Sequence, residues 1–181
     1  MQDTTSNLSS VMRVNQREGF HTSYSSSLVS LGPGALFART TCPPMTLTPT
    51  ARWSSVQVSE NQHIELNTDL VFINHSCEPS LEFHVISDSS DQPVIELRVA
   101  TRVNENGLPK GLSVGDELTF FYPSTEWEMQ QSFKCLCGTK SCHGEIRGAK
   151  YMTPEQLRGY FINAHIEDLR SVPAGDEKKR A

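Results

Sequence analysis

The sequence predicts a mainly β domain of the α+β class that ends in one C-terminal helix. Apolar and polar residues alternate in short stretches, most clearly over residues 81–86 and 94–100, as in strands with one buried face. One strong helix-start signal stands at Thr153-Pro154. The chain has 181 residues, 36% of them hydrophobic, which suits a single domain with its own core.

Residues 1–38 should contain short strands separated by turns. Residues 1–10 are rich in Ser, Thr and Asn and are predicted to be disordered. Residues 19–31 mix apolar residues with many serines, which predicts short strands in a polar connection. Gly32-Pro33-Gly34 then breaks the chain before a short apolar strand over residues 35–38.

The middle of the chain is predicted to be β-structure as well. Residues 53–66 alternate as two strands joined at residues 60–62. The apolar residues 70–73 should be buried, and they lead the chain into Asn74. Residues 81–86 and 94–100 should pair as a hairpin across the turn at residues 87–93.

The last third of the chain combines one more strand with the helix. A turn over residues 104–111 leads to a strand at 114–122, and a single helical turn is expected at 125–129. Thr153 is a helix N-cap followed by proline at the first helical position. The apolar residues after it share one face and predict a helix to about Leu169.

Composition and charge narrow the functions that the chain can have. A formal net charge of −5 disfavours a nucleic-acid backbone as partner, because phosphate binding needs a basic surface. No apolar run reaches the roughly eighteen residues of a membrane span, and polar residues 1–10 lack the apolar centre of a secretion signal. Five cysteines, an odd number, suit a reducing compartment better than a disulfide framework. We therefore expect a nuclear or cytoplasmic protein with no membrane contact.

Three of the cysteines form a cluster with the spacing of metal ligands. Cys135, Cys137 and Cys142 lie close together in the sequence, with Gly138 giving the turn between them its freedom. Structural zinc takes four tetrahedral ligands. Cys77 is the natural fourth donor, because it sits in another polar, turn-forming motif, whereas Cys42 lies in a proline-flanked stretch. The alternative is a disulfide or buried thiols without a metal.

Three motifs in a fixed order resemble a known family. They are Asn-His-Ser-Cys-x-Pro at 74–79, Gly-Asp-Glu-Leu-Thr-Phe-Phe-Tyr at 115–122 and Cys-x-Cys-x4-Cys-x-Gly at 135–144. Together they resemble the SET domain of protein-lysine methyltransferases with its cysteine-rich post-SET segment. A looser match over residues 32–38 extends the resemblance toward the N-terminus.

The resemblance implies a SET fold of small β-sheets with a pseudoknot, in which one segment passes through a loop against the general rule. The SET domain, with a minimal insert, would cover residues 11–134, and a post-SET zinc segment residues 135–150. The C-terminal helix would cover residues 151–172 and a flexible tail residues 173–181.

The resemblance also implies two cofactors, S-adenosylmethionine and Zn²⁺. The zinc would be held by Cys77, Cys135, Cys137 and Cys142 and would fasten a flap over the adenosine. The residues that carry over as contacts of S-adenosylmethionine are Gly32, Gly34, Leu36, Phe37, Asn74, His75, Tyr122, Phe133 and Leu136. A plain tight turn at the glycines, and a bracing role for Asn74 and His75, remain as alternatives.

Tyr122 is the implied catalytic residue, with Phe120, Phe121 and Trp127 lining the substrate channel. Free lysine has a pKa near 10.4, which leaves under about 0.1% of it neutral at pH 7. A narrow apolar channel beside a positive sulfonium disfavours the ammonium form, and the Tyr122 hydroxyl would orient the amine. Phe120, without a hydroxyl, would leave room for di- and trimethylated lysine. A packed core position is the alternative for both Tyr122 and Trp127.

The implied function is methyl transfer to a lysine ε-amine of a protein, with a histone as candidate. The sequence departs from the family where Phe121 replaces an acidic residue, where Ser80 replaces an asparagine, and in one extra residue after Gly34. The segment between Gly34 and Asn74 is also shorter than the usual helical insert, which forms one wall of the peptide groove. A homodimer could rebuild that wall. Otherwise the scaffold could bind or transform a small molecule, or serve as a non-catalytic zinc-stabilised binding module.

Overall fold

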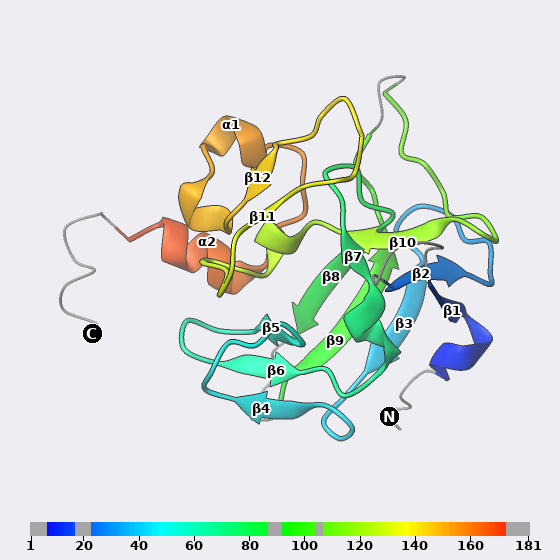
Figure 1. Ribbon diagram of the computed structural model, residues 1–181, viewed down its shortest axis with the longest axis horizontal. Helices are drawn as coiled ribbons and strands as arrows, with labels where there is room; N and C mark the ends of the chain where they lie inside the picture. The colour runs from blue at the N-terminus through cyan, green and yellow to red at the C-terminus, as the bar shows by residue number, and fades with distance from the viewer. Residues whose placement is uncertain (1–6, 17–22, 87–91, 104–106, 173–181) are drawn as a thin grey trace.

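The computed structural model describes residues 7–16, 23–86, 92–103 and 107–172. Short β-strands in four small sheets make up most of its regular structure, with two short α-helices near the C-terminus (Figure 1). The prediction of a mainly β fold is therefore confirmed. In the segment expected to be disordered, the chain forms a 3₁₀ helix, η1 (Leu8–Ser10). The predictions for residues 1–6, for the turns at 87–91 and 104–106, and for the tail at 173–181 lie outside the described residues.

The three-stranded sheet β3-β9-β8 carries the centre of the core. It consists of β3 (Leu36–Thr40), β9 (Val94–Val99) and β8 (Leu81–Ile86), all antiparallel. The predicted hairpin is confirmed, because β8 and β9 pair along their whole length from Leu81 opposite Val99. β9 is the middle strand and buries five of its six residues, including Glu96, whose carboxylate pairs with Arg39 and Arg98.

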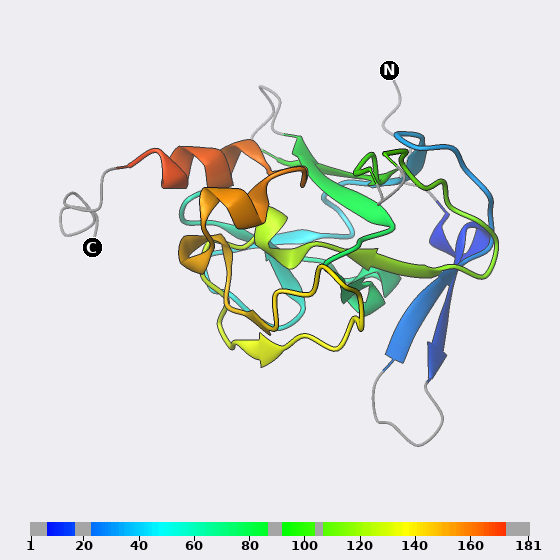
Figure 2. The same ribbon diagram turned by 90° about the horizontal axis from the view of Figure 1, so that it is seen from above.

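A four-stranded sheet in the order β1-β2-β10-β7 positions the motif at Asn74. Its strands are β1 (Met12–Gln16), β2 (Ser23–Ser27), β10 (Glu117–Phe120) and β7 (Asn74–His75). β10 is antiparallel to β2 but parallel to β7, so two motifs far apart in sequence run side by side toward the same end. Figure 2 shows β1 and β2 projecting from the body as an arm.

Between β3 and β7 the chain forms a third sheet, in the order β4-β6-β5. Its strands are β4 (Thr46–Thr48), β5 (Ser55–Gln57) and β6 (His63–Glu65), so the two strands predicted around residues 60–62 are confirmed. The 3₁₀ helix η2 (Asp69–Phe72) follows and leads into β7. A small sheet therefore occupies the place of the short insert.

The prediction of one C-terminal helix is wrong, because residues 107–172, the last described range, contain two. α1 (Pro154–Leu157) begins with a complete capping box at Thr153, as the sequence indicated. It ends after one turn because Gly159 adopts a left-handed φ of +81°. The second helix, α2 (Ala164–Arg170), follows the 3₁₀ helix η4 (Ala149–Tyr151) and α1 in the chain.

The start of α2 is fixed by tertiary hydrogen bonds. The buried Asn163 side chain donates to the carbonyl oxygens of Phe83 (2.8 Å) and Ser124 (2.9 Å). Its own oxygen accepts from the Val85 backbone N–H at 2.8 Å. These contacts dock α2 against β8. They join residues far apart in the sequence, so the helical periodicity of the sequence could not predict them.

The helical turn expected at residues 125–129 lies elsewhere. The chain instead forms the 3₁₀ helix η3 (Tyr122–Ser124), directly after β10. Pro123 lies in its first turn and favours this early start. The turn brings Tyr122 back over the end of the sheet.

Buried residues fall into two unequal clusters. The larger, here called the main core, joins the sheets β3-β9-β8, β4-β6-β5 and β10. The smaller contains Cys77, Cys135 and Ile146. Apart from Cys77, it lies in the segment of residues 133–148, here called the cysteine segment, whose strands β11 (Phe133–Lys134) and β12 (Glu145–Ile146) form a two-stranded sheet.

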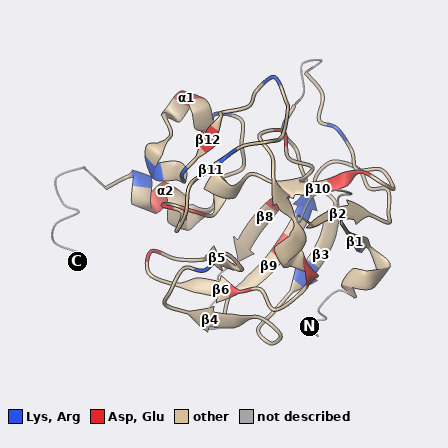
Figure 3. Cartoon of the chain, viewed as in Figure 1, with Lys and Arg blue, Asp and Glu red and all other residues tan. Residues whose placement is uncertain are grey.

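The described surface mixes both signs of charge. Figure 3 shows Lys and Arg interspersed with Asp and Glu along the ribbon. Among the described helices, none has the length and apolar character needed to cross a bilayer.

Candidate active site

The structure brings Cys77 together with Cys135, Cys137 and Cys142. The four Sγ atoms lie within 4.8 Å of one another, and those of Cys77 and Cys135 are 3.9 Å apart. That separation is far too long for a disulfide. It matches tetrahedral zinc, because Zn–S bonds of about 2.3 Å place two sulfurs about 3.8 Å apart. The four residues therefore fit a metal ion.

Electrostatics give a second reason for a cation at this cluster. Burial raises the pKa of Cys77 above its usual value and raises the pKa of Cys135 to about 11, and neighbouring thiolates add to both shifts. Four ionised thiols at this spacing would repel one another unless a cation lay between them. The backbone N–H of His143 points at the Cys77 sulfur from 3.4 Å, as expected around a thiolate ligand.

His75 connects the cysteine cluster to Tyr122. Its Nδ1 accepts a hydrogen bond from the Tyr122 backbone N–H at 3.2 Å, and its Nε2 lies 3.4 Å from the Cys77 sulfur. Burial lowers the pKa of His75 to about 4, so the ring is neutral and its one proton is assigned to Nε2, which donates to the sulfur. Its ring also packs edge-on against Tyr122 and Phe133.

A cavity of about 660 Å³ opens beside this cluster. It is lined by both strands of the parallel pair and by the cysteine segment. Five residues predicted to contact the cofactor line it, namely Asn74, His75, Tyr122, Phe133 and Leu136. Leu136 is 88% exposed, so its contacts are with the open side of the cavity. Asn74 is held by a hydrogen bond from its amide to the Ser23 carbonyl oxygen (2.9 Å).

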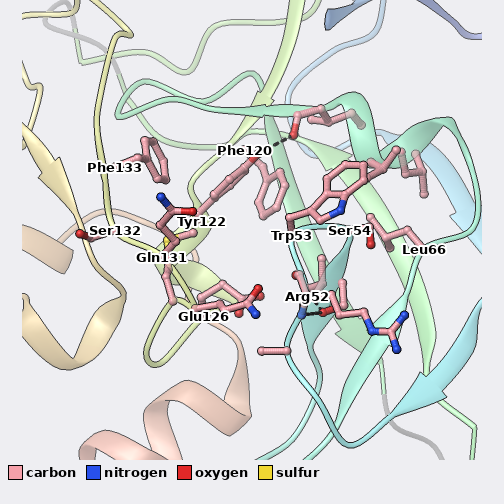
Figure 4. Close-up of a pocket in the computed structure, with 18 residues that line it drawn as sticks. Arg52, Trp53, Ser54, Leu66, Phe120, Tyr122, Glu126, Gln131, Ser132 and Phe133 are labelled. Atoms are coloured by element: carbon pink, nitrogen blue, oxygen red, sulfur yellow. Dashed lines mark hydrogen bonds between the residues drawn. The ribbon is translucent and has the colours of Figure 1, made fainter. Parts of the chain in front are cut away.

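A smaller cavity of about 390 Å³ lies on the other side of Tyr122. Figure 4 shows its wall, with Phe120, Tyr122 and Phe133 on one side and Trp53 and Leu66 on the other. Most of the lining is apolar. It comes from residues 51–56, which connect β4 to β5 and begin β5, from η2 and from residues 126–133. Phe120 was predicted to line a substrate channel, and it faces this cavity.

Tyr122 and Phe133 line both cavities. The Tyr122 hydroxyl donates a hydrogen bond to the Ile73 carbonyl oxygen at 3.1 Å, which fixes the ring at the junction. Burial, and then the negative charge of Glu126, raise the pKa of the hydroxyl above its usual value. Tyr122 therefore stays protonated at neutral pH and can position a polar group that enters from either side.

Other residues expected at the site lie elsewhere. Phe121 stacks on Tyr160, with ring centroids 3.8 Å apart, and faces neither of these two cavities. Trp127 lines neither one, and its backbone N–H donates to the Gln57 side chain at 2.8 Å. For Trp127 and Phe121 the channel role stays a prediction that these positions do not support.

The predicted glycine turn does not line these two cavities either. Phe37 is buried in the main core, and Leu36 is partly exposed on β3. Gly34 needs to be glycine because its φ is +75°, whereas Gly32 has open space where a side chain would begin. The role of Gly32, Gly34, Leu36 and Phe37 in cofactor binding stays a prediction.

Sequence reasoning missed most of the lining residues, and three of them bear on the chemistry of the site. Gly111 lines the larger cavity, and a Cβ there would come within 3.0 Å of the Leu31 carbonyl oxygen. Trp53 lines the smaller cavity although 81% of it is exposed. Glu126 places a buried carboxylate in the same cavity. Its position four residues after Tyr122 was the one available signal, but the segment was predicted to be a helical turn.

Comparison with known proteins defines the class. No protein-family model matches the chain. A relative that matches most of the chain supports methyl transfer as its general activity.

The relative is methyltransferase flvH of the fungus Aspergillus flavus, which is 45% identical to this chain over 150 residues. The match covers 82% of this chain and 75% of flvH. The chain therefore belongs to the same family as methyltransferase flvH.

Proposed function

We propose that this protein is a SET-domain enzyme that transfers a methyl group from S-adenosylmethionine to a lysine ε-amine of a protein, with a histone tail as first candidate. One observation carries the proposal. Tyr122 forms a shared wall between the larger and the smaller cavity, so a methyl donor on one side and an amine on the other would meet at its hydroxyl. The adjacent parallel strands β7 and β10 agree with the family's pseudoknot.

The larger cavity suits S-adenosylmethionine, which when bound supplies a methyl group carried on a positive sulfonium. Asn74 offers both a donor pair and an acceptor, and Phe133 offers an aromatic face over the same space. The proposed Zn²⁺ at Cys77, Cys135, Cys137 and Cys142 would hold Phe133 and Leu136 over this cavity.

Tyr122 would orient the acceptor. Its proton is engaged by the Ile73 carbonyl oxygen, so the hydroxyl oxygen is left to accept a hydrogen bond from the incoming N–H. Next to the positive sulfonium, the apolar part of the smaller cavity's lining disfavours an ammonium and favours the neutral amine that can attack. Holding the two reactants in line supplies much of the remaining rate by proximity.

A small-molecule amine is the second candidate acceptor. The observation that favours it is the β4-β6-β5 sheet, which replaces a helical wall and leaves Trp53 exposed at the cavity. A cavity of about 390 Å³ falls in the size range of small-ligand sites. A homodimer that rebuilds a peptide groove, and a nuclear or cytoplasmic location, belong to the protein-substrate proposal.

The test is transfer of a tritiated methyl group from S-adenosylmethionine to histones, to cell lysate and to a metabolite extract. Label in protein supports the first acceptor, and label confined to small molecules supports the second. Label in none of the three, despite bound donor, contradicts the proposed transfer.

The variant Tyr122→Phe tests the residue that carries the proposal. Because it loses only the positioning hydroxyl, we expect turnover to fall about 10²–10⁴-fold, while donor affinity in isothermal titration stays unchanged. Tyr151→Phe is the matched control, since Tyr151 is partly exposed and its hydroxyl contacts Glu128 outside both cavities. Near-normal turnover of Tyr122→Phe would remove this residue from its role.

A further inference from the structure

We infer that Glu126 is the group that recognises the acceptor, by pairing with its ammonium in the smaller cavity and then taking its proton. The inference rests on the proposed function and names the substrate class of that site, a cationic alkylamine. It assigns the carboxylate a catalytic role beside Tyr122.

The Glu126 carboxylate lies in the smaller cavity, close to Tyr122. Glu126 is a buried residue that lines the smaller cavity together with Tyr122, and Figure 4 shows it beneath Tyr122 on the cavity wall. Its negative charge also contributes to the raised pKa of Tyr122, so the two groups interact electrostatically. A cation bound by Glu126 would therefore lie close to the proposed reaction centre.

Hydrogen bonds fix the Glu126 carboxylate through one of its two oxygens. One oxygen, Oε1, accepts hydrogen bonds from the Gln57 backbone N–H (2.8 Å) and from the Thr125 hydroxyl (3.4 Å). The Gln57 side chain in turn accepts from the Trp127 backbone N–H at 2.8 Å. These contacts fix the carboxylate through Oε1 and leave Oε2 for a ligand in the cavity.

The buried Glu126 carboxylate has no cationic hydrogen-bond partner among the described residues. The hydrogen-bond partners of Glu126 in the described structure are neutral groups, and a buried carboxylate without a cation is costly. Burial raises its pKa to about 7, so it can either carry its charge or hold a proton near neutral pH. An ammonium entering the apolar cavity supplies the missing positive charge.

The surrounding titratable groups do not take over this role. Tyr122 stays protonated and therefore carries no charge. Arg52 lines the same cavity, but it is exposed and its positive charge cannot pair with an ammonium. On the far side of Thr125, His165 is fixed to the Thr125 carbonyl oxygen at 2.9 Å. Burial lowers the pKa of both His165 and His63, so both are neutral near pH 7.

The proton balance is simple. The substrate ammonium gives one proton to the Glu126 carboxylate, which leaves a neutral amine and a neutral carboxylic acid. The amine nitrogen then forms its bond to the methyl carbon as the carbon–sulfur bond breaks, with the bonding pair going to sulfur. The new secondary ammonium later loses a proton to water, and Glu126 returns its own proton to solvent. The exposed ring of Trp53 offers an aromatic face to the cation as it enters.

The experiment compares a cation with its neutral isostere. The probes are n-butylamine, which is an ammonium at pH 8, and 1-butanol. Each is titrated into the full chain saturated with S-adenosylhomocysteine and followed by ligand-observed NMR. We expect the wild type to bind the amine at least about tenfold more tightly than the alcohol, as a hydrogen bond to a charged partner predicts.

Glu126→Gln should abolish this preference, because it keeps the shape and removes the charge. Glu126→Asp, which keeps the charge on a shorter side chain, should retain a weaker preference. Glu128→Gln is the matched control, since the Glu128 carboxylate is exposed and pairs with Lys150 outside the cavity, and it should behave as the wild type. In the wild type, amine affinity should rise with pH through about 7 as Glu126 ionises, and Glu126→Gln should lose this dependence.

Equal binding of the two probes by the wild type overturns the inference. So does a folded Glu126→Gln protein, checked by circular dichroism, that keeps the preference. Donor binding and tritium transfer are measured separately. If the donor binds and transfers its methyl group but the probes bind equally, this inference fails alone. If the preference is present but no donor binds, the proposed function fails instead.

Discussion

The main core and the cysteine segment are held together by different forces. The main core buries eighteen residues in one cluster, whereas the cluster of the cysteine segment buries only Cys77, Cys135 and Ile146. Its most apolar exposed residue, Leu136, faces solvent. Burying two thiols and one isoleucine contributes only a few kcal/mol, which is too little to order a segment of this length against its loss of conformational entropy.

The difference shows where the stability of the active site comes from. The main core supplies β10, Phe120 and the support for Tyr122, and it depends on the hydrophobic effect. The cysteine segment supplies Phe133 and Leu136 to the larger cavity, and in our proposal it depends on a metal ion that joins its four sulfurs. Structural zinc contributes roughly 10–16 kcal/mol in small zinc domains. Half of the proposed donor site would therefore form only when metal is bound.

Metal removal should produce the largest effect. We expect one zinc per folded chain by elemental analysis. A chelator, or Cys135→Ser, should remove hydrogen-exchange protection from residues 133–148 while residues 81–86 and 94–99 keep theirs. Cys135→Ser should weaken zinc binding more than about 100-fold, because even the outer partners of metal ligands are worth about 10–100-fold. Methyl transfer should be lost with the metal.

Cys42→Ser is the control for this experiment, since Cys42 packs against the main core and lies outside the four-sulfur cluster. It should change neither zinc content nor exchange in the cysteine segment. Absence of zinc from the purified protein, or full protection of residues 133–148 after chelation, would show that this segment is stabilised in another way.

Two alanine variants that remove buried side chains of similar size should have the next largest effects, and these effects should differ between the two regions. Leu97 on β9 is fully buried in the main core, so Leu97→Ala should lower the free energy of unfolding by about 2–5 kcal/mol in urea titration. Ile146→Ala removes a similar side chain from the small cluster. It should speed exchange in the cysteine segment and leave the urea midpoint of the main core nearly unchanged. A global loss of equal size from both variants would mean that the regions unfold as one unit.

The same contrast explains which parts of the molecule could be predicted from the sequence. β8 alternates in pattern because its environment repeats every two residues, whereas β9 is buried over five of its six residues and is rich in β-branched apolar residues. The local sequence therefore predicts both strands. The cysteines were predictable because metal ligands have characteristic spacing, and Cys77 was reached by elimination of Cys42. For the strands and for Cys135, Cys137 and Cys142, the constraint acts between residues that are close in the sequence.

The errors came from constraints that act across the fold. Helical periodicity after Thr153 hid the left-handed Gly159 and the long-range contacts of Asn163. Glu126 was not singled out from the sequence, because nothing local reveals that it is buried at the cavity wall and accepts from the Gln57 backbone N–H. The predicted glycine turn lies outside the two cavities and Gly111 lines the larger one, so contact of Gly32 and Gly34 with the cofactor stays a prediction.

A pair of glycines gives the smallest and most specific test of the two regions. Gly138 in the cysteine segment and Gly115 before β10 both have positive φ, +67° and +89°, and a Cβ added to either would meet no atom within 4 Å beyond its chain neighbours. Alanine at either site therefore adds the backbone cost of a left-handed residue, about 1–2 kcal/mol, without a clash.

Gly138→Ala should lower zinc affinity by about fivefold or more and leave the urea midpoint unchanged, because about 1.4 kcal/mol corresponds to about tenfold. Gly115→Ala should lower the urea midpoint and leave zinc affinity unchanged, measured by competition with a chromophoric chelator. If both variants changed both quantities, folding of the main core and metal binding would be coupled, and the division into two separately stabilised regions would be wrong.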